Sequence, residues 1–106
     1  MKRTLYEINS EKWEKDEYGE FTEGPYDSQC IRVNTRKEAQ VYIDDFKKEH
    51  PKAKKYNLCY DEEDLDMGIY EQKAICTLKA IIPDLDAPGG EIEIMFDVLK
   101  LVVDWD

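Results

Sequence analysis

The sequence predicts a single α+β domain, residues 1–106, in which one helix packs on a mainly antiparallel sheet of four to five strands. Residues 36–49 carry apolar side chains at helical spacing, whereas the segments before and after them alternate between apolar and polar side chains. A chain of 106 residues, 42% of them hydrophobic, is long enough to fold as one domain around a single hydrophobic core. The order of the segments is ββαβββ, which is typical of α+β layering.

The predicted sheet begins with two strands, residues 4–14 and 28–33, which are rich in β-prone side chains. Between them, residues 15–27 contain two glycines and a proline among acidic and aromatic residues. This composition predicts either an exposed hairpin or a long loop.

The predicted helix, residues 36–49, has signals at both of its ends. Thr35 is a candidate N-cap, and Glu38 completes a capping box in which each side chain accepts a bond from a backbone N–H. Pro51 ends the helix, because the residue before a proline is disfavoured in the helical conformation. One face of the helix carries the apolar residues Ala39, Tyr42, Ile43 and Phe46.

Three more strands are predicted after the helix, at residues 55–60, 70–82 and 91–103. Residues 61–68 are too acidic for a strand, and the connector at 83–90 contains two prolines and two glycines. Near Val98 and Leu99 the apolar positions change phase, so either a β-bulge lies there or the strand end is covered on both faces. The last two strands are expected at the centre of the sheet. Alternatively the last strand lies at an edge and pairs with a second copy, so we expect a monomer or a homodimer.

Charge is divided unevenly along the chain. The sequence holds 25 acidic and 15 basic residues, a net charge of −10. Residues 32–55 hold eight basic and four acidic residues, a net +4, so the remaining chain, with seven basic and 21 acidic residues, carries −14. The acidic residues gather in three places, at residues 11–23, 61–66 and 84–106. Such a surface either keeps a small protein soluble or attracts a basic partner.

From this charge pattern we expect a small acidic, non-enzymatic binding module or inhibitor that contacts a basic protein surface, such as that of a nucleic-acid-binding protein. Aromatic side chains among the acids are candidate contact groups, because aromatic residues often anchor interfaces. The candidate partner-binding residues are Trp13, Asp16, Glu17, Tyr18, Glu20, Phe21, Asp61, Glu62, Glu63, Asp64 and Asp66. Plain solubility, with no partner, is the competing interpretation.

Two other functions remain open at this point. The first is nucleic-acid mimicry of the phage or mobile-element type, in which carboxylates take the places of phosphates and block a DNA- or RNA-binding protein. The second is an uncharacterised enzyme built on paired carboxylates. Asp97 lies inside an otherwise apolar strand, and burial there would raise its pKa. An outward-facing Asp97 is the competing interpretation.

The spacing of potential ligands favours neither a metal centre nor a cofactor. The acidic run before Gly68 lacks the EF-hand pattern, and the cysteines at positions 30, 59 and 76 lack the short spacings of a zinc site. We expect all three thiols to be buried and inert. A glycine-rich phosphate loop is also missing, so the sequence predicts no catalytic, metal-binding or cofactor-binding residue.

No apolar run in the sequence reaches the length of a transmembrane helix, and the first residues are too charged for a signal peptide. An odd number of cysteines without a signal peptide favours a reducing compartment, so we expect a cytoplasmic protein. Direct binding of nucleic acid is not expected. Although lysines gather at residues 47–55, most of the chain would repel phosphate.

Overall fold

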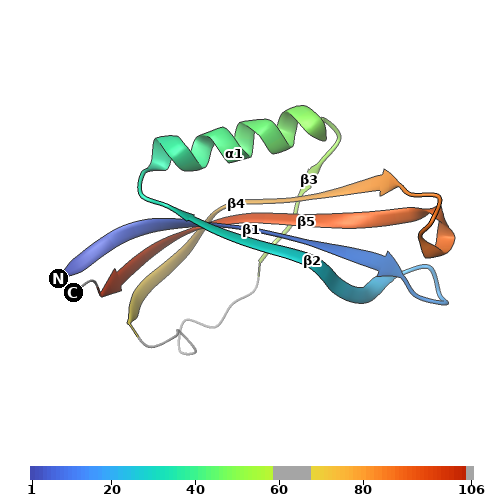
Figure 1. Ribbon diagram of the computed structural model, residues 1–106, viewed down its shortest axis with the longest axis horizontal. Coiled ribbons are helices and arrows are strands. Elements are labelled where there is room, and N and C mark those ends of the chain that lie inside the picture. The colour runs from blue at the N-terminus through green and yellow to red at the C-terminus, as the bar shows by residue number, and fades with distance from the viewer. Residues whose placement is uncertain (59–67, 105–106) are drawn as a thin grey trace.

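The structure is a computed structural model that describes residues 1–58 and 68–104. One helix lies on one face of a long, twisted, five-stranded sheet (Figure 1). All neighbouring strands are antiparallel, in the order β2-β1-β5-β4-β3. The α+β class and the ββαβββ order are therefore confirmed. The elements are β1 (Lys2–Lys15), β2 (Phe21–Val33), α1 (Arg36–Glu49), β3 (Lys54–Lys55), β4 (Ile69–Pro83), the 3-10 turn η2 (Pro88–Gly90) and β5 (Glu91–Asp104).

β1 and β2 form a long hairpin, so the alternative of a long loop at residues 15–27 is wrong. β2 begins at Phe21, and its pairing with β1 contains register shifts between Ser10 and Lys15. These shifts accommodate Gly24 and Pro25. β2 is also an edge strand, where a proline is tolerated because its missing N–H is not needed for a second ladder.

Helix α1 has the predicted bounds and a slightly different cap. The Thr35 Oγ1 accepts a bond from the Glu38 N–H at 3.1 Å, as expected. The Glu38 carboxylate accepts a bond from the Thr35 hydroxyl, also at 3.1 Å, rather than from a backbone N–H. At the other end, the His50 N–H donates to the Phe46 carbonyl at 2.9 Å.

β3 contains two residues instead of the six predicted at 55–60. Residues 56–58 lie outside any strand, and positions 59 and 60 are outside the described residues. Side-chain bonds hold the chain after Lys55 in place of a regular ladder. The Thr77 hydroxyl donates to the Tyr56 carbonyl, and the Tyr56 hydroxyl donates to the Phe96 carbonyl at 3.4 Å.

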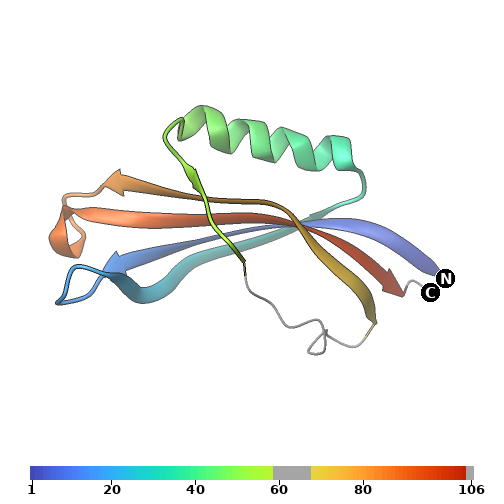
Figure 2. The same cartoon turned by 180° about the vertical axis from the view of Figure 1, so that it is seen from behind.

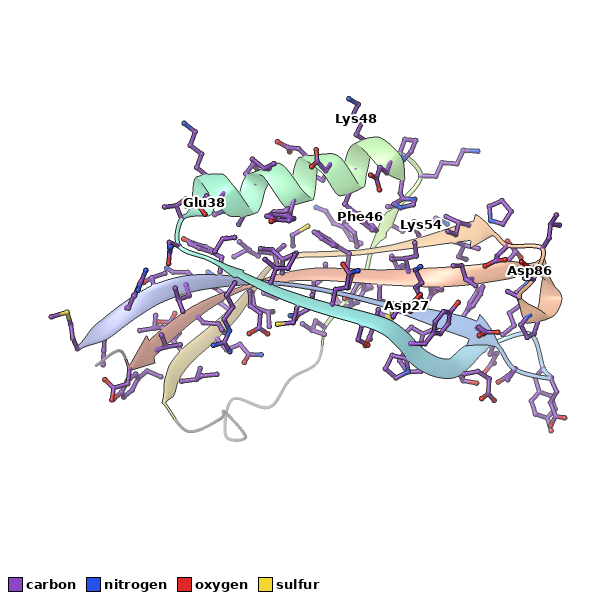
Figure 3. The ribbon with its side chains drawn as sticks, in the orientation of Figure 1. Asp27, Glu38, Phe46, Lys48, Lys54 and Asp86 are labelled. Carbon is purple, nitrogen blue, oxygen red and sulfur yellow. The ribbon has the colours of Figure 1, made fainter. Side chains whose placement is uncertain are left out.

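The face of the sheet that α1 covers, here called the front face, carries the larger apolar cluster. Phe46 points from the helix toward the sheet (Figure 3), where its ring stacks on Phe96 with the ring centroids 4.5 Å apart. Val98 and Ala39 are fully buried in the same cluster. The cluster consists of Ile8, Ala39, Ile43, Phe46, Leu78, Ala80, Phe96 and Val98.

A second apolar cluster lies on the opposite face of the sheet, here called the back face, and contains Leu5, Leu99, Leu101 and Val103. The back face points away from α1, which lies above the sheet in Figure 1 and Figure 2. This second cluster explains the change of phase in β5. β5 pairs with β1 without a register shift through Val98 and Leu99. Its buried apolar residues pass from the front face, at Phe96 and Val98, to the back face from Leu99 onward, where partly buried Leu58 packs on the back cluster. A bulge does exist, but it lies in β4, between Ala74 and Cys76.

β5 occupies the centre of the sheet, between β1 and β4. The prediction of a central final hairpin is therefore confirmed for this strand, and the alternative of an edge position is wrong. The physical reason is that β5 contributes buried residues to both apolar clusters, to the front cluster through Phe96 and Val98 and to the back cluster through Leu99, Leu101 and Val103.

Candidate functional site

Two hairpin ends that are far apart in sequence meet at one end of the molecule, opposite the two chain termini (Figure 1). One is the turn between β1 and β2, and the other is the connection between β4 and β5. The Lys15 ammonium joins them, because it lies 2.7 Å from the Glu91 carboxylate. We call residues 12–27 and 82–93 the acidic end.

The acidic end holds most of the charge of the protein. It contains ten acidic and two basic residues, a net −8 out of a total of −10. Both basic side chains are already paired: Lys15 with Glu91 at 2.7 Å, and Lys12 with Asp27 at 3.4 Å. The fold thus joins the first acidic cluster of the sequence and residues 84–93 of the third into one region of strong negative potential.

An exposed apolar side chain stands at the tip of each hairpin. Tyr18 is 83% exposed in the β1–β2 turn, and Leu85 is 98% exposed in the connection between β4 and β5. Tyrosine is among the residue types that most often contribute binding energy at interfaces. The acidic end therefore combines charge with apolar contact groups.

Asp16 fixes the conformation of the β1–β2 turn. Its Oδ1 accepts bonds from the N–H groups of Tyr18 and Glu20, both at 2.9 Å, and its Oδ2 accepts a bond from the Thr22 hydroxyl at 2.6 Å. The bond from Thr22 is the largest cause that holds the pKa of Asp16 below its usual value, and the bond from Glu20 adds to it. Asp16 thus positions Tyr18 at the tip.

A similar arrangement holds the connection between β4 and β5. The Asp84 Oδ1 accepts a bond from the Asp86 N–H at 3.0 Å, and the Ala87 N–H donates to the Asp84 carbonyl at 3.2 Å. The Asp84 N–H in turn donates to the Gly90 carbonyl at 2.9 Å. These bonds hold Leu85 and Asp86 at the extremity of the molecule, where Figure 3 labels Asp86.

The structure separates the predicted contact residues. Glu17, Tyr18 and Glu20 are exposed at the tip. Trp13 is half-buried, and its Nε1–H donates to Glu11 at 3.2 Å. Phe21 is half-buried too, with the Lys15 ammonium 5.5 Å from its ring centroid. The remaining predictions, Asp61, Glu62, Glu63, Asp64 and Asp66, lie outside the described residues.

Sequence reasoning omitted the second hairpin from the contact set. Leu85, Asp86 and Glu91 join the acidic end only because β4 and β5 run antiparallel and return their connection to the tip of the first hairpin. The sequence does contain a sign that Leu85 is exposed. Leu85 lies between two aspartates in a connector, so it has no strand or helix face on which to pack.

Asp97 lies half-buried on the back face, away from the acidic end. The Asn9 Nδ2–H groups donate to Asp97 Oδ1 at 3.0 Å and to Glu7 Oε1 at 3.2 Å. Burial raises the pKa of Asp97, and the negative charges of Glu11 and Glu7 raise it further. Asp97 also lines a depression of about 310 Å³ together with Cys30.

The cysteines differ from the prediction of buried thiols. Cys30 is exposed on β2, so the prediction is wrong for this residue. β2 is an edge strand, and among the described residues its side chains have neighbours from β1 on one side only. Cys76 is half-buried, and position 59 is outside the described residues. Within residues 1–58 and 68–104, no three Cys, His, Asp or Glu side chains are arranged to hold a metal ion.

In the described part of the chain, no helix is long and apolar enough to cross a membrane. Comparison with protein-family models, curated proteins and solved structures finds no match for this chain. The function is therefore argued from the geometry and the charge of the protein itself.

Proposed function

We propose that the protein is a small, non-enzymatic binding module whose acidic end docks on a basic surface of a partner protein. The observation that carries this proposal is the meeting of two hairpins that concentrate a net charge of −8 around two exposed apolar tips. Complementary charge steers partners together and selects among them, and exposed apolar groups add contact area that is buried on binding.

Hydrogen bonds within each tip favour recognition by a preformed surface. The Oδ1 atoms of Asp16 and Asp84 each accept bonds from backbone N–H groups of their own turns, which fixes the positions of the neighbouring side chains. A surface that is ordered before binding loses less conformational entropy when it docks. The odd number of cysteines favours a reducing compartment, and we place the protein in the cytoplasm as part of this proposal.

The test compares two variants that remove the same amount of charge from different places. The tip variant carries Glu17→Gln, Glu20→Gln and Asp86→Asn, and the control variant carries Asp45→Asn, Glu49→Gln and Glu71→Gln. All six side chains are exposed. Each tagged protein is used to capture partners from a lysate of the source cell, and the captured proteins are quantified by mass spectrometry.

We expect wild type and the control variant to capture the same partner at about 20 mM salt, and we expect capture to fall at about 300 mM salt because screening weakens long-range attraction. The tip variant should capture at least about tenfold less, a loss near 1.4 kcal/mol. Equal losses in both variants would show that net charge alone matters and would remove the proposed docking end.

The same experiment addresses the mimicry alternative. A nucleic-acid mimic must occupy the site where its partner binds phosphates, so duplex DNA or RNA added to the purified complex would displace the protein. Displacement would turn the general proposal into mimicry, whereas a complex that persists in excess nucleic acid would leave the general proposal and exclude mimicry.

A further inference from the structure

A basic groove lies between helix α1 and the outer strands of the sheet, at β3 and β4. It has a volume of about 290 Å³ and is lined by three cationic side chains from three places in the fold: Arg36 in the first turn of α1, Lys47 in its last turn, and Lys55 in β3. Ile43 and Ile75 form apolar walls, and half-buried Cys76 also lines the groove. The groove is positive although the protein as a whole carries −10.

The positive charge of this groove is not neutralised within residues 1–58 and 68–104. No carboxylate in that part of the chain forms an ion pair with Arg36, Lys47 or Lys55. The lysines of the acidic end, by contrast, are both paired. Three cations that line one groove repel one another, so an anion bound in the groove would stabilise their arrangement.

A hydrogen bond to the neutral side-chain amide of Gln40 orients Arg36 and does not neutralise its charge. The Arg36 Nη1–H donates to the Gln40 Oε1 at 2.8 Å, and the Gln40 Nε2–H donates to the Asp44 Oδ1 at 2.8 Å. These residues are four positions apart along α1, which places them on adjacent turns. Asp44 therefore orients the Gln40 amide, and Gln40 in turn presents an oxygen to one side of the guanidinium fork.

The same three cations act on the thiol at the base of the groove. Burial raises the pKa of Cys76, and the positive charges of Lys47, Arg36 and Lys55 oppose that rise. This agrees with the lining of the groove, in which all three cationic side chains and Cys76 take part. At Cys30, the exposed cysteine on edge strand β2, partial desolvation and the negative charge of Glu7 raise the pKa, and the positive charge of Arg32 opposes them.

We propose that this basic groove binds a phosphate group. A guanidinium fork matches phosphate oxygens in a bidentate arrangement, and lysines supply point charges around it. A phosphate monoester carries about −1.5 to −2 at neutral pH, which balances most of the charge of three cations. A single carboxylate would leave two of the three cations without a counterion. This site is distinct from the acidic end and does not depend on its proposed function.

The first test titrates the whole protein with inorganic phosphate, pyrophosphate and citrate at low ionic strength, followed by amide NMR spectra. We expect the two phosphate compounds to shift the signals around Arg36, Lys47, Lys55 and Cys76. A Lys47→Gln/Lys55→Gln variant should bind at least about tenfold more weakly, a loss near 1.4 kcal/mol. The matched control is Lys37→Gln/Lys48→Gln, which removes two exposed lysines from the same helix; Lys48 points away from the sheet in Figure 3.

Three outcomes would overturn the proposal. One is the absence of shifts at these residues up to about 10 mM phosphate or pyrophosphate, which corresponds to negligible affinity. Another is equal weakening in the groove variant and the control variant, which would indicate a response to net charge. The third is binding of citrate as tight as that of pyrophosphate, which would show a site for any polyanion.

A second readout compares the alkylation of Cys76 and Cys30 by iodoacetate, which is anionic, and by iodoacetamide, which is neutral. The ratio of the two rates cancels the thiolate fraction of each cysteine and reports the local potential. We expect a higher iodoacetate-to-iodoacetamide ratio at Cys76 than at Cys30, a fall of that ratio in Lys47→Gln/Lys55→Gln, and protection of Cys76 alone by phosphate. Equal ratios at the two cysteines would contradict an open basic groove.

Discussion

The back face of strand β5 has two halves of opposite character. In the half near the chain termini, Leu99, Leu101 and Val103 face back and form a buried cluster with Leu5 of the neighbouring strand. In the half at the acidic end, the corresponding alternate positions are Glu91 and Glu93, which are only partly buried. The same strand and the same face thus serve packing at one end and charge at the other. The buried half stabilises the sheet, and the charged half belongs to the end that we propose docks on a partner.

The largest expected change in the free energy of unfolding comes from a substitution in the back cluster, the buried half of this face. Leu101 is 1% exposed and lies in the centre of the back cluster. Leu101→Ala removes buried apolar contacts and leaves a cavity, so we expect the free energy of unfolding to fall by about 2–5 kcal/mol. Urea denaturation followed by circular dichroism measures this loss.

At a temperature where Leu101→Ala is still folded, its partner capture should equal that of wild type, because Leu101 lies away from both hairpin tips. A stability loss below about 0.5 kcal/mol, the range of surface substitutions, would show that the back cluster does not support the sheet.

The layers of the fold were predictable because they depend on local patterns. The helical spacing of Ala39, Ile43 and Phe46 between Thr35 and Pro51 determines both the bounds of α1 and its buried face. β2 was less predictable, because Gly24 and Pro25 resemble loop residues. They are accommodated only by the register shifts of an edge strand, and position in the sheet is a tertiary property.

Only the first hairpin of the candidate site could be predicted, because the position of the second hairpin beside it is also a tertiary property. Tyr18, Glu17 and Glu20 stand out locally as an aromatic residue among acids in a glycine-containing turn. Leu85 and Asp86 join them through the antiparallel pairing of β4 with β5, about 65 positions later in the chain. The charges of the basic groove also come from separate elements, so their convergence depends on how α1 lies over β4.

Substitution of Asp97, near the boundary between the two halves of the back face, is expected to change the free energy of unfolding by a smaller amount. Its pKa is raised in the folded protein above the ordinary value of 3.8, so the ionised form opposes folding. Asp97→Asn keeps an oxygen that accepts the bond from Asn9 and removes the charge. We expect a gain in unfolding free energy of less than about 1.5 kcal/mol at neutral pH, the scale of a single polar interaction.

The pH dependence of this gain has a definite sign. It should be complete above the raised pKa of Asp97, decrease as the pH falls through that pKa, and vanish below 3.8, where the carboxyl is protonated in both folded and unfolded protein. Denaturation of both proteins at a series of pH values measures it, with Asp45→Asn, at an exposed position of α1, as a control. A gain that stays constant down to pH 3 would show that charge is not its cause.

Substitution of Leu85 is expected to have the smallest effect on stability but a large effect on binding. Leu85 is an exposed leucine at the acidic end, whereas Leu101 is a buried leucine in the opposite half of the sheet. Leu85 is 98% exposed, so Leu85→Ser should change the free energy of unfolding by less than about 0.5 kcal/mol. Capture of the partner should nevertheless fall, because the docked tip would lose its apolar contact. Val41→Ser, on a helix residue that is 56% exposed, changes an apolar surface residue outside the acidic end and should leave capture unchanged. If Leu85→Ser and Val41→Ser behave alike while neutralisation of the tip carboxylates still reduces capture, the partner recognises the charge of the acidic end without its apolar tips.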